Sequence, residues 1–186
     1  MSIRTKSEAV AASLVAAVMF AGCSTVPKTE EKKQDIQTSA DRELREFVEM
    51  DPSLQPLLNR SAGYAVFPDV GKGGLIAGGA WGRGVVYQNG RPIGFASITQ
   101  GTVGAQVGGQ VVSELVVLET QDAMTKLKND QLSLAANASA VILKKGVGAS
   151  ATFRDGVAVF YRSEAGAMLE AAVGGQRFDF EPMQMR

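Results

Sequence analysis

The pattern of apolar and polar positions changes its period along the chain. Residues 10–21 form one short apolar run. Apolar residues then recur at the helical spacing i, i+3, i+4 in two segments, formed by Leu44, Phe47 and Val48 and by Leu54, Leu57 and Leu58. Asp51 followed by Pro52 is typical of an N-cap and a first-turn proline, so a second helix is predicted there. We expect both apolar stripes to pack on the domain core.

From Gly63 onward the period becomes two, which is typical of strands. Asn89-Gly90, placed between apolar runs at residues 85–87 and 93–98, predicts a hairpin with a type I′ turn. Asp155-Gly156 predicts a second hairpin between residues 151–153 and 157–161. Further strands are predicted at residues 103–107, 111–118, 140–143 and 176–180, a helix at 121–129, and a turn at 132–136.

Glycine is unusually dense in the β-rich segment, at positions 71, 73, 74, 78, 79, 82, 84, 90, 94, 101, 104, 108 and 109. Glycine inside a strand weakens it, and its usual causes are sharp coiling, a bulge, or the close approach of a backbone or ligand. We therefore predict an α+β fold, in which a curved antiparallel sheet or partial barrel carries helices at the start and middle of the domain.

The first residues have the pattern of a bacterial export signal. Arg4 and Lys6 precede the apolar run, which is too short to span a membrane comfortably and ends in Phe20-Ala21-Gly22-Cys23. This ending resembles a lipobox, so Cys23 is predicted to be acylated after cleavage, which gives stable anchoring. We expect a signal peptide at 1–22, a flexible tether at 23–38 and one domain at 39–186. By resemblance to the sorting rules of lipoproteins in Gram-negative bacteria, Ser24, a residue other than Asp after the cysteine, implies the outer membrane, where we expect the domain to face the periplasm.

Composition excludes several classes of function. Basic and acidic residues number 19 each, whereas a nucleic-acid binder usually carries a basic excess. Histidine is absent and Cys23 is the single cysteine, which removes the commonest metal ligands and catalytic pairs. The Gly71–Gly74 run lacks the hydroxyl residue and the spacing of a phosphate loop. We therefore expect no enzyme, no metal and no cofactor.

The remaining polar and aromatic candidates have ordinary explanations. Four acids, Asp69, Glu114, Glu119 and Asp122, are expected to be solvated surface groups. Trp81, Phe67 and Tyr64 are expected in the core. Between positions 61 and 160 there are eight basic residues against six acidic ones. Lys144-Lys145 falls in a predicted loop before Gly146, where it is either a solvated loop or a site for anionic headgroups, since Lys and Arg attract acidic lipid.

Residues 62–74, AGYAVFPDVGKGG, resemble the opening signature of the SYLF domain, also called the Ysc84-like or DUF500 family. Residues 78–87, 104–110, 136–139 and 146–148 fit the same family, so the resemblance covers about residues 43–180. It implies a lipid-binding module without catalysis; eukaryotic members favour phosphoinositides, and some fungal members act on actin. The basic positions that match the family are Lys72, Arg83 and Lys144.

The function predicted from the sequence is a non-enzymatic module that binds anionic phospholipid or phosphoinositide-like headgroups. Its expected site is a basic surface formed by Lys72, Arg83, Lys144 and Lys145. The alternative is a structural or adaptor lipoprotein that binds another envelope protein or a cell-wall component. An envelope hydrolase is a remote third option.

Overall fold

The computed structural model describes residues 29–74, 77–103, 110–134, 140–162 and 175–183. Within these ranges the helices are α2 (Glu30–Met50), α3 (Leu54–Arg60) and α4 (Gln121–Lys128), with a 3-10 turn, η2 (Gly148–Ser150). The strands are β1 (Gly63–Gly74), β2 (Ala77–Gln88), β3 (Arg91–Val103), β4 (Gln110–Leu118), β5 (Ser133–Leu134), β6 (Ala140–Ile142), β7 (Val157–Arg162) and β8 (Gln176–Pro182).

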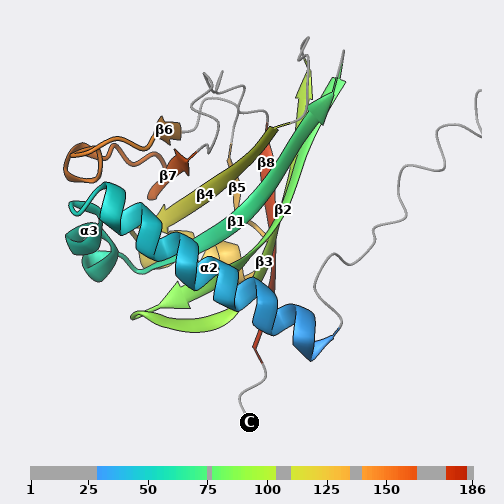
Figure 1. Cartoon of the computed structure of the whole chain (residues 1–186), viewed down its shortest axis with the longest axis horizontal. Coiled ribbons are helices and arrows are strands. Elements are labelled where there is room, and N and C mark those ends of the chain that lie inside the picture. The colour runs from blue at the N-terminus through green and yellow to red at the C-terminus, as the bar shows by residue number, and fades with distance from the viewer. Residues whose placement is uncertain (1–28, 75–76, 104–109, 135–139, 163–174, 184–186) are drawn as a thin grey trace, which may run out of the picture.

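These strands form one curled sheet in the order β5-β8-β3-β2-β1-β4-β7-β6 (Figure 1). All neighbouring pairs are antiparallel except β6 and β7, which are parallel. A parallel pair needs a long connection, and residues 143–156 supply it. The predicted α+β fold with a curved sheet and helices at its start and middle is confirmed, and the parallel pair is its one departure from a purely antiparallel sheet.

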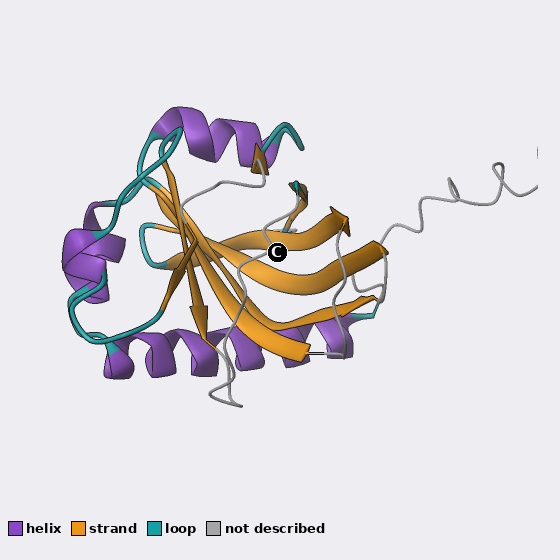
Figure 2. Ribbon diagram, turned by 90° about the horizontal axis from the view of Figure 1, so that it is seen from above, coloured by secondary structure: helices purple, strands orange, loops and turns teal. Residues whose placement is uncertain are grey.

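Helices cover both faces of the sheet (Figure 2). On one face α2 and α3 pack over the α2-side cluster, which includes Val66, Val85, Leu115 and Phe160. On the other face α4 packs over the α4-side cluster, which includes Phe67, Ile98, Val116 and Phe178. Alternate residues of each central strand belong to opposite clusters, as the period of two requires.

Helix α2 begins earlier than the apolar stripe at Leu44 predicts. The Thr29 side chain accepts a hydrogen bond from the Lys32 N–H at 3.4 Å, and Glu30 and Glu31 occupy the first turn, where the helix dipole favours acids. Residues 30–38, expected to belong to a flexible tether, are therefore helical. No helix in the described part of the chain is long and apolar enough to cross a membrane.

The Asn-Gly hairpin is confirmed: Asn89 (φ 52°) and Gly90 (φ 72°) join β2 to β3. Asp155 (φ 51°) and Gly156 (φ 74°) also form a tight turn, but its arms pair only at the Arg154–Val157 bridge. Residues 151–153 are not a strand, because β7 already pairs with β4 and β6.

The other predicted elements agree with the structure in part. The strands at residues 111–118, 140–143 and 176–180 and the helix at 121–129 are confirmed as β4, β6, β8 and α4. The turn predicted at 132–136 is wrong at Ser133–Leu134, which form the short strand β5 beside β8. Residues 104–107 of one predicted strand lie outside the described residues.

Candidate functional site

The two adjacent lysines lie on a turn that a buried carboxylate holds in place. Lys144 and Lys145 are exposed, and the Lys144 carbonyl accepts a hydrogen bond from the Val147 N–H at 3.2 Å. Gly146, which follows the two lysines and precedes Val147, adopts φ 88°. The N–H of Gly146 donates to Asp51 Oδ1 at 3.0 Å, and the N–H of Gly148 donates to Asp51 Oδ2 at 2.7 Å. Because both amides end on one side chain, the turn is fixed to the start of α3.

The N-cap of α3 is Ser53, so the N-cap predicted at Asp51 and the first-turn proline predicted at Pro52 lie just before the helix, but the Asp51 side chain still binds the turn that leads into it. Its Oδ1 accepts from the Ser53 N–H at 3.1 Å and from the Ser53 hydroxyl at 2.7 Å. Burial alone raises the pKa of this carboxyl, but the donors from Gly148, Ser53 and Gly146 favour the charged form and hold its pKa below the usual 3.8. Asp51 is therefore a charged anchor beneath the lysine turn.

Arg83 lies on a different part of the molecule, on the face of β2 that points to the α2 side. Its guanidinium carbon is 4.7 Å from the centre of the Trp81 ring. Trp81 is 43% exposed, so its expected place in the core is wrong, whereas Phe67 and Tyr64 are buried as predicted. The difference arises because the strands extend beyond the part of the sheet that α2 covers (Figure 1).

The four predicted headgroup residues do not form one patch. Lys72 lies opposite Ala80 in β2, and Arg83 lies opposite Asp69, three register steps along the same hairpin. The 143–156 connection that carries Lys144 and Lys145 lies at the other side of the molecule from the ends of β1 and β2 (Figure 1). Lys72 pairs with Ala80 of the α4-side cluster, whereas Arg83 is on the α2 side, so the lysine turn, Lys72 and Arg83 are three separate basic positions. Cys23 lies outside the described residues.

One polar cluster was missed by the sequence reasoning. Glu114 is fully buried in β4 rather than solvated, and Gln176 Nε2 lies 3.1 and 3.2 Å from its two carboxylate oxygens. The same Nε2 lies 3.1 Å from the Tyr161 hydroxyl and 3.4 Å from Gln100 Oε1. The position of Glu114 within the apolar run at residues 111–118 was the sequence feature that could have indicated its burial. Asp69, Glu119 and Asp122 are exposed, as expected.

The electrostatics of this cluster favour structure over proton transfer. Burial raises the pKa of Tyr161 far above its usual value, and the nearby Glu114 carboxylate adds to the increase. Its phenol therefore stays protonated at physiological pH and serves as a hydrogen-bonding group. Among the described residues, no group of three or more His, Cys, Asp or Glu side chains is arranged to hold a metal ion.

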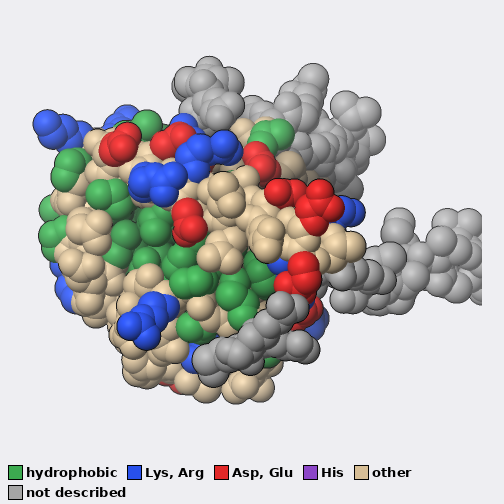
Figure 3. Space-filling model, turned by 60° about the horizontal axis from the view of Figure 1, so that its bottom comes forward, with side chains coloured by type: hydrophobic (Ala, Val, Ile, Leu, Met, Phe, Trp, Pro, Cys, Tyr) green, Lys and Arg blue, Asp and Glu red, His purple; other side chains and the backbone are tan. Residues whose placement is uncertain are grey.

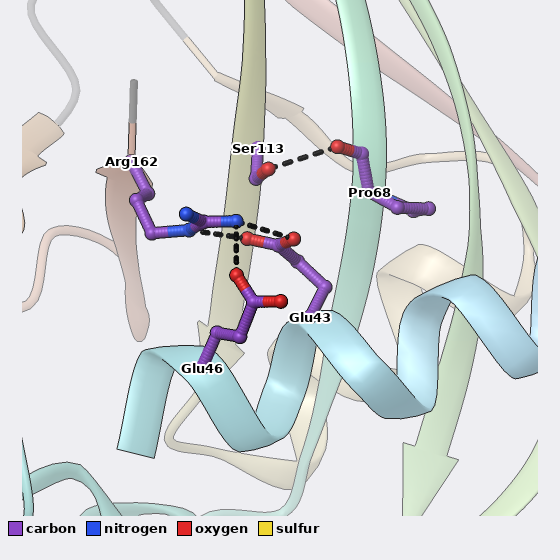
Figure 4. A network of polar contacts seen from close by, with 5 residues as sticks. All are labelled: Glu43, Glu46, Pro68, Ser113 and Arg162. Carbon is purple, nitrogen blue, oxygen red and sulfur yellow. Dashed lines mark hydrogen bonds and ion pairs between the residues drawn. The ribbon is translucent and has the colours of Figure 1, made fainter. Parts of the chain in front are cut away.

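A second charged network ties α2 to the sheet (Figure 4). Arg162, at the end of β7, donates to Glu43 from Nε at 2.6 Å and from Nη2 at 2.7 Å. Its Nη2 is also 2.7 Å from Glu46 Oε2. Elsewhere on α2, the Tyr87 hydroxyl donates to Asp41 at 2.6 Å. These contacts position the helix and leave the lysine turn outside the network.

Charges of both signs are interspersed on the face of the molecule in Figure 3, with an apolar area between them. This arrangement matches the equal numbers of basic and acidic residues in the chain. On this face the basic side chains therefore lie among acidic and apolar ones and do not form one continuous basic surface.

The α2-covered curled sheet with its exposed, anchored turn defines a small α+β domain. Residues 99–182 match the Ysc84 family model, described as "Las17-binding protein actin regulator". The match confirms the predicted resemblance to the Ysc84 (SYLF) family over residues 99–182. No curated protein matches the chain.

Proposed function

We propose that this domain is a non-enzymatic module that binds anionic lipid surfaces through the lysine turn. The observation that carries the proposal is the anchoring of the turn by Asp51, which leaves Lys144 and Lys145 exposed on a fixed backbone. In the described part of the chain neither lysine forms an ion pair. Both ammonium groups are thus available to phosphate.

A fixed turn favours binding because little backbone order remains to be lost on contact. Gly148 packs so closely on α3 that an added Cβ would lie 2.9 Å from the Leu54 backbone nitrogen. The turn therefore presents its lysines in one arrangement. Each Lys near an acidic membrane contributes about 1 kcal/mol, so two give a modest contact that needs support from a second membrane attachment.

The second attachment in this proposal is acylated Cys23, which would hold the domain at the outer membrane on its periplasmic side. The helical start of α2 at Glu30 leaves residues 24–29 between Cys23 and the folded domain. Such a short connection keeps the domain close to the surface to which the lipid is attached. Replacing Cys23 with Ala should release the chain from membranes or leave it unprocessed. If the variant fractionates and migrates on a gel like the natural chain, the anchor proposal fails.

The test of lipid binding compares two double charge reversals in the chain from Ser24 onward, which contains every described helix and strand. Lys144→Glu with Lys145→Glu should lower affinity for phosphatidylglycerol vesicles at least tenfold, from about 1 kcal/mol per charge. The matched control, Arg42→Glu with Arg45→Glu, makes the same charge change at exposed positions on α2 and should bind nearly as the unmodified chain does.

Binding should also weaken as salt rises, because exposed charges are screened beyond about 8 Å at physiological ionic strength. Equal losses in both double variants would mean that net charge matters and the lysine turn does not. If the unmodified chain ignores acidic vesicles at low salt, the lipid proposal fails. The adaptor function then takes its place, in line with the family description, which names a protein partner.

A further inference from the structure

An uncovered row of residues crosses four strands on the α2 side of the sheet. Thr99 of β3 lies opposite Trp81 of β2, Trp81 lies opposite Gly71 of β1, and Gly71 lies opposite Val111 of β4. We call these four residues the Trp81 platform. Trp81 is 43% and Val111 is 61% exposed, and Thr99 and Gly71 are exposed as well. Trp81 and Val111, with Gly71 between them, are therefore exposed apolar side chains on this side of the sheet.

Two exposed glycines at or near this row, Gly71 and Gly101, are not required by close contacts within the fold. A Cβ added at Gly71 would have its nearest neighbour at 3.9 Å, and one added at Gly101 would meet nothing within 4 Å. By contrast, a Cβ at Gly84 would lie 2.2 Å from the Val66 carbonyl oxygen. Gly71 and Gly101 also lack a positive φ. Glycine weakens a strand, so its presence where a side chain would fit points to a ligand that approaches the backbone closely.

Arg83 packs against the Trp81 ring. Its Nε is buried without a hydrogen-bond partner, and its guanidinium lies on the ring. The charged side chains next to the platform balance, because Arg83 and Arg177 stand against Asp69 and Asp179. Arg83 lies opposite Asp69, and Arg177 lies opposite Thr99 and 3.4 Å from Asp179.

We propose that the Trp81 platform binds a neutral polysaccharide chain, with one sugar ring lying on Trp81 over the glycine floor. A pyranose ring has a flat apolar face of C–H groups that packs on an indole, and hydroxyl groups at its edge that both donate and accept hydrogen bonds. Arg83 and Thr99 supply donors, and Asp69 and Thr99 supply acceptors. A flat floor without side chains lets the ring approach the strands.

The balance of charge separates this ligand from the lipid proposed for the lysine turn. An anionic membrane needs a surplus of positive charge, which the two Arg and two Asp side chains described beside the platform do not provide. A polyhydroxyl chain needs mixed donors and acceptors, which they do provide. The proposal concerns a second surface and holds or fails independently of lipid binding at the lysine turn.

Trp81 is the only tryptophan in the chain, so its fluorescence reports on this platform alone. We expect cellohexaose or chitohexaose to change the Trp81 emission of the chain from Ser24 onward, with a dissociation constant of about 1 mM or tighter. The change should be the same at about 50 mM and about 500 mM salt, since the ligand carries no charge for salt to screen.

Gly71→Val should weaken the interaction at least tenfold, because its side chain occupies the floor while its Cβ lies at an ordinary contact distance, 3.9 Å, from the Trp81 carbonyl oxygen. Ser133→Val, at an exposed position of the edge strand β5, is the matched control and should bind like the unmodified chain. Trp81→Ala, measured by calorimetry, should show no binding.

Three results would overturn the proposal. The first is no response to either hexasaccharide at concentrations of about 10 mM, well above the expected dissociation constant. The second is an equal loss of binding in the Gly71 and Ser133 variants. The third is a Trp81 response to phosphatidylglycerol vesicles without a response to the sugars, which would make the platform a lipid contact.

Discussion

Arg162 and Glu43 form a two-pronged ion pair in which Nε and Nη2 of the guanidinium each donate to a different carboxylate oxygen, at 2.6 and 2.7 Å. The side chains are 13% and 6% exposed, so water screens the pair weakly. The pair joins the middle of α2 to the end of β7, residues separated by most of the domain.

Arg162→Gln should therefore destabilise the fold by about 2–3 kcal/mol, because it leaves two carboxylates, Glu43 and Glu46, near one another without their cation. The measurement is the free energy of unfolding from urea denaturation. Lys126→Gln also removes one positive charge from an ion pair, but that pair, with Asp122 at 2.7 Å, is more exposed, and the change should cost less than about 0.5 kcal/mol. Similar losses in the two variants would contradict a special role for the buried pair.

Asp51 predicts a pH dependence of stability with a definite sign. Its pKa is lowered in the folded state, so its contribution is fully present above the unfolded-state value near 3.8 and is lost as pH falls through the lower folded-state pKa. Asp51→Asn should cost about 1–3 kcal/mol at neutral pH, because three backbone amides lose a charged acceptor.

The difference in unfolding free energy between Asp51→Asn and the unmodified chain should shrink as pH falls below about 4, where the unmodified carboxyl takes up its proton. Urea denaturation at several pH values measures this. Asp35→Asn, at an exposed position on α2, serves as the control and should stay within about 0.5 kcal/mol throughout. A constant difference for Asp51→Asn down to pH values of about 3 would exclude the proposed charge on the anchor.

Gly84 and Gly71 lie on adjacent strands and should respond oppositely to alanine. An added Cβ at Gly84 would lie 2.2 Å from the Val66 carbonyl oxygen and 2.6 Å from Phe67 Cδ1, so Gly84→Ala should cost about 3 kcal/mol. The Cβ of Gly71→Ala would lie 3.9 Å from the Trp81 carbonyl oxygen, an ordinary contact, so this change should leave stability unchanged or raise it by about 0.5 kcal/mol. Thermal melts of the two variants decide this; a large loss at Gly71 would show that the fold itself needs that glycine.

The two turn glycines should also differ. Gly90 has φ 72° with nothing near its Cβ position, so Gly90→Val pays only for the strained backbone, about 1–2 kcal/mol. Gly156 has φ 74°, and its Cβ would lie 2.6 Å from Thr120 Oγ1, which caps α4 by accepting from the Ala123 N–H. Gly156→Val should therefore cost more. Equal melting temperatures for the two variants would contradict this order.

Features encoded by neighbouring residues could be predicted from the sequence. Asn89-Gly90 specifies its turn through the φ angles that these two residues tolerate, and the helix at 121–129 follows from local periodicity. The same holds for the burial of Leu54, Leu57 and Leu58. In each case the controlling contacts lie within one turn or one hairpin.

Features fixed by distant residues could not be predicted. The burial of Glu114 depends on a register that brings it beside Tyr161 and Gln176, which come from β7 and β8. The exposure of Trp81 depends on how far α2 reaches across the sheet, which no local pattern gives. The separation of Lys144 and Lys145 from Arg83 has the same cause, since Asp51, distant in the sequence, binds the Gly146 N–H and so fixes the position of the lysine turn.

The strand order has a consequence for how the sheet is completed during synthesis. The central strands β2 and β1 come from the first half of the domain, whereas both flanks, β8 beside β3 and β7 beside β4, come from its last third. The outer edge of β3 therefore stays without its native neighbour until residues 176–182 are available. An unpaired edge of this length is a template for joining other chains. A nascent chain halted shortly before Gln176 would have its central strands paired, but the outer edge of β3 would be unpaired and able to associate with other chains.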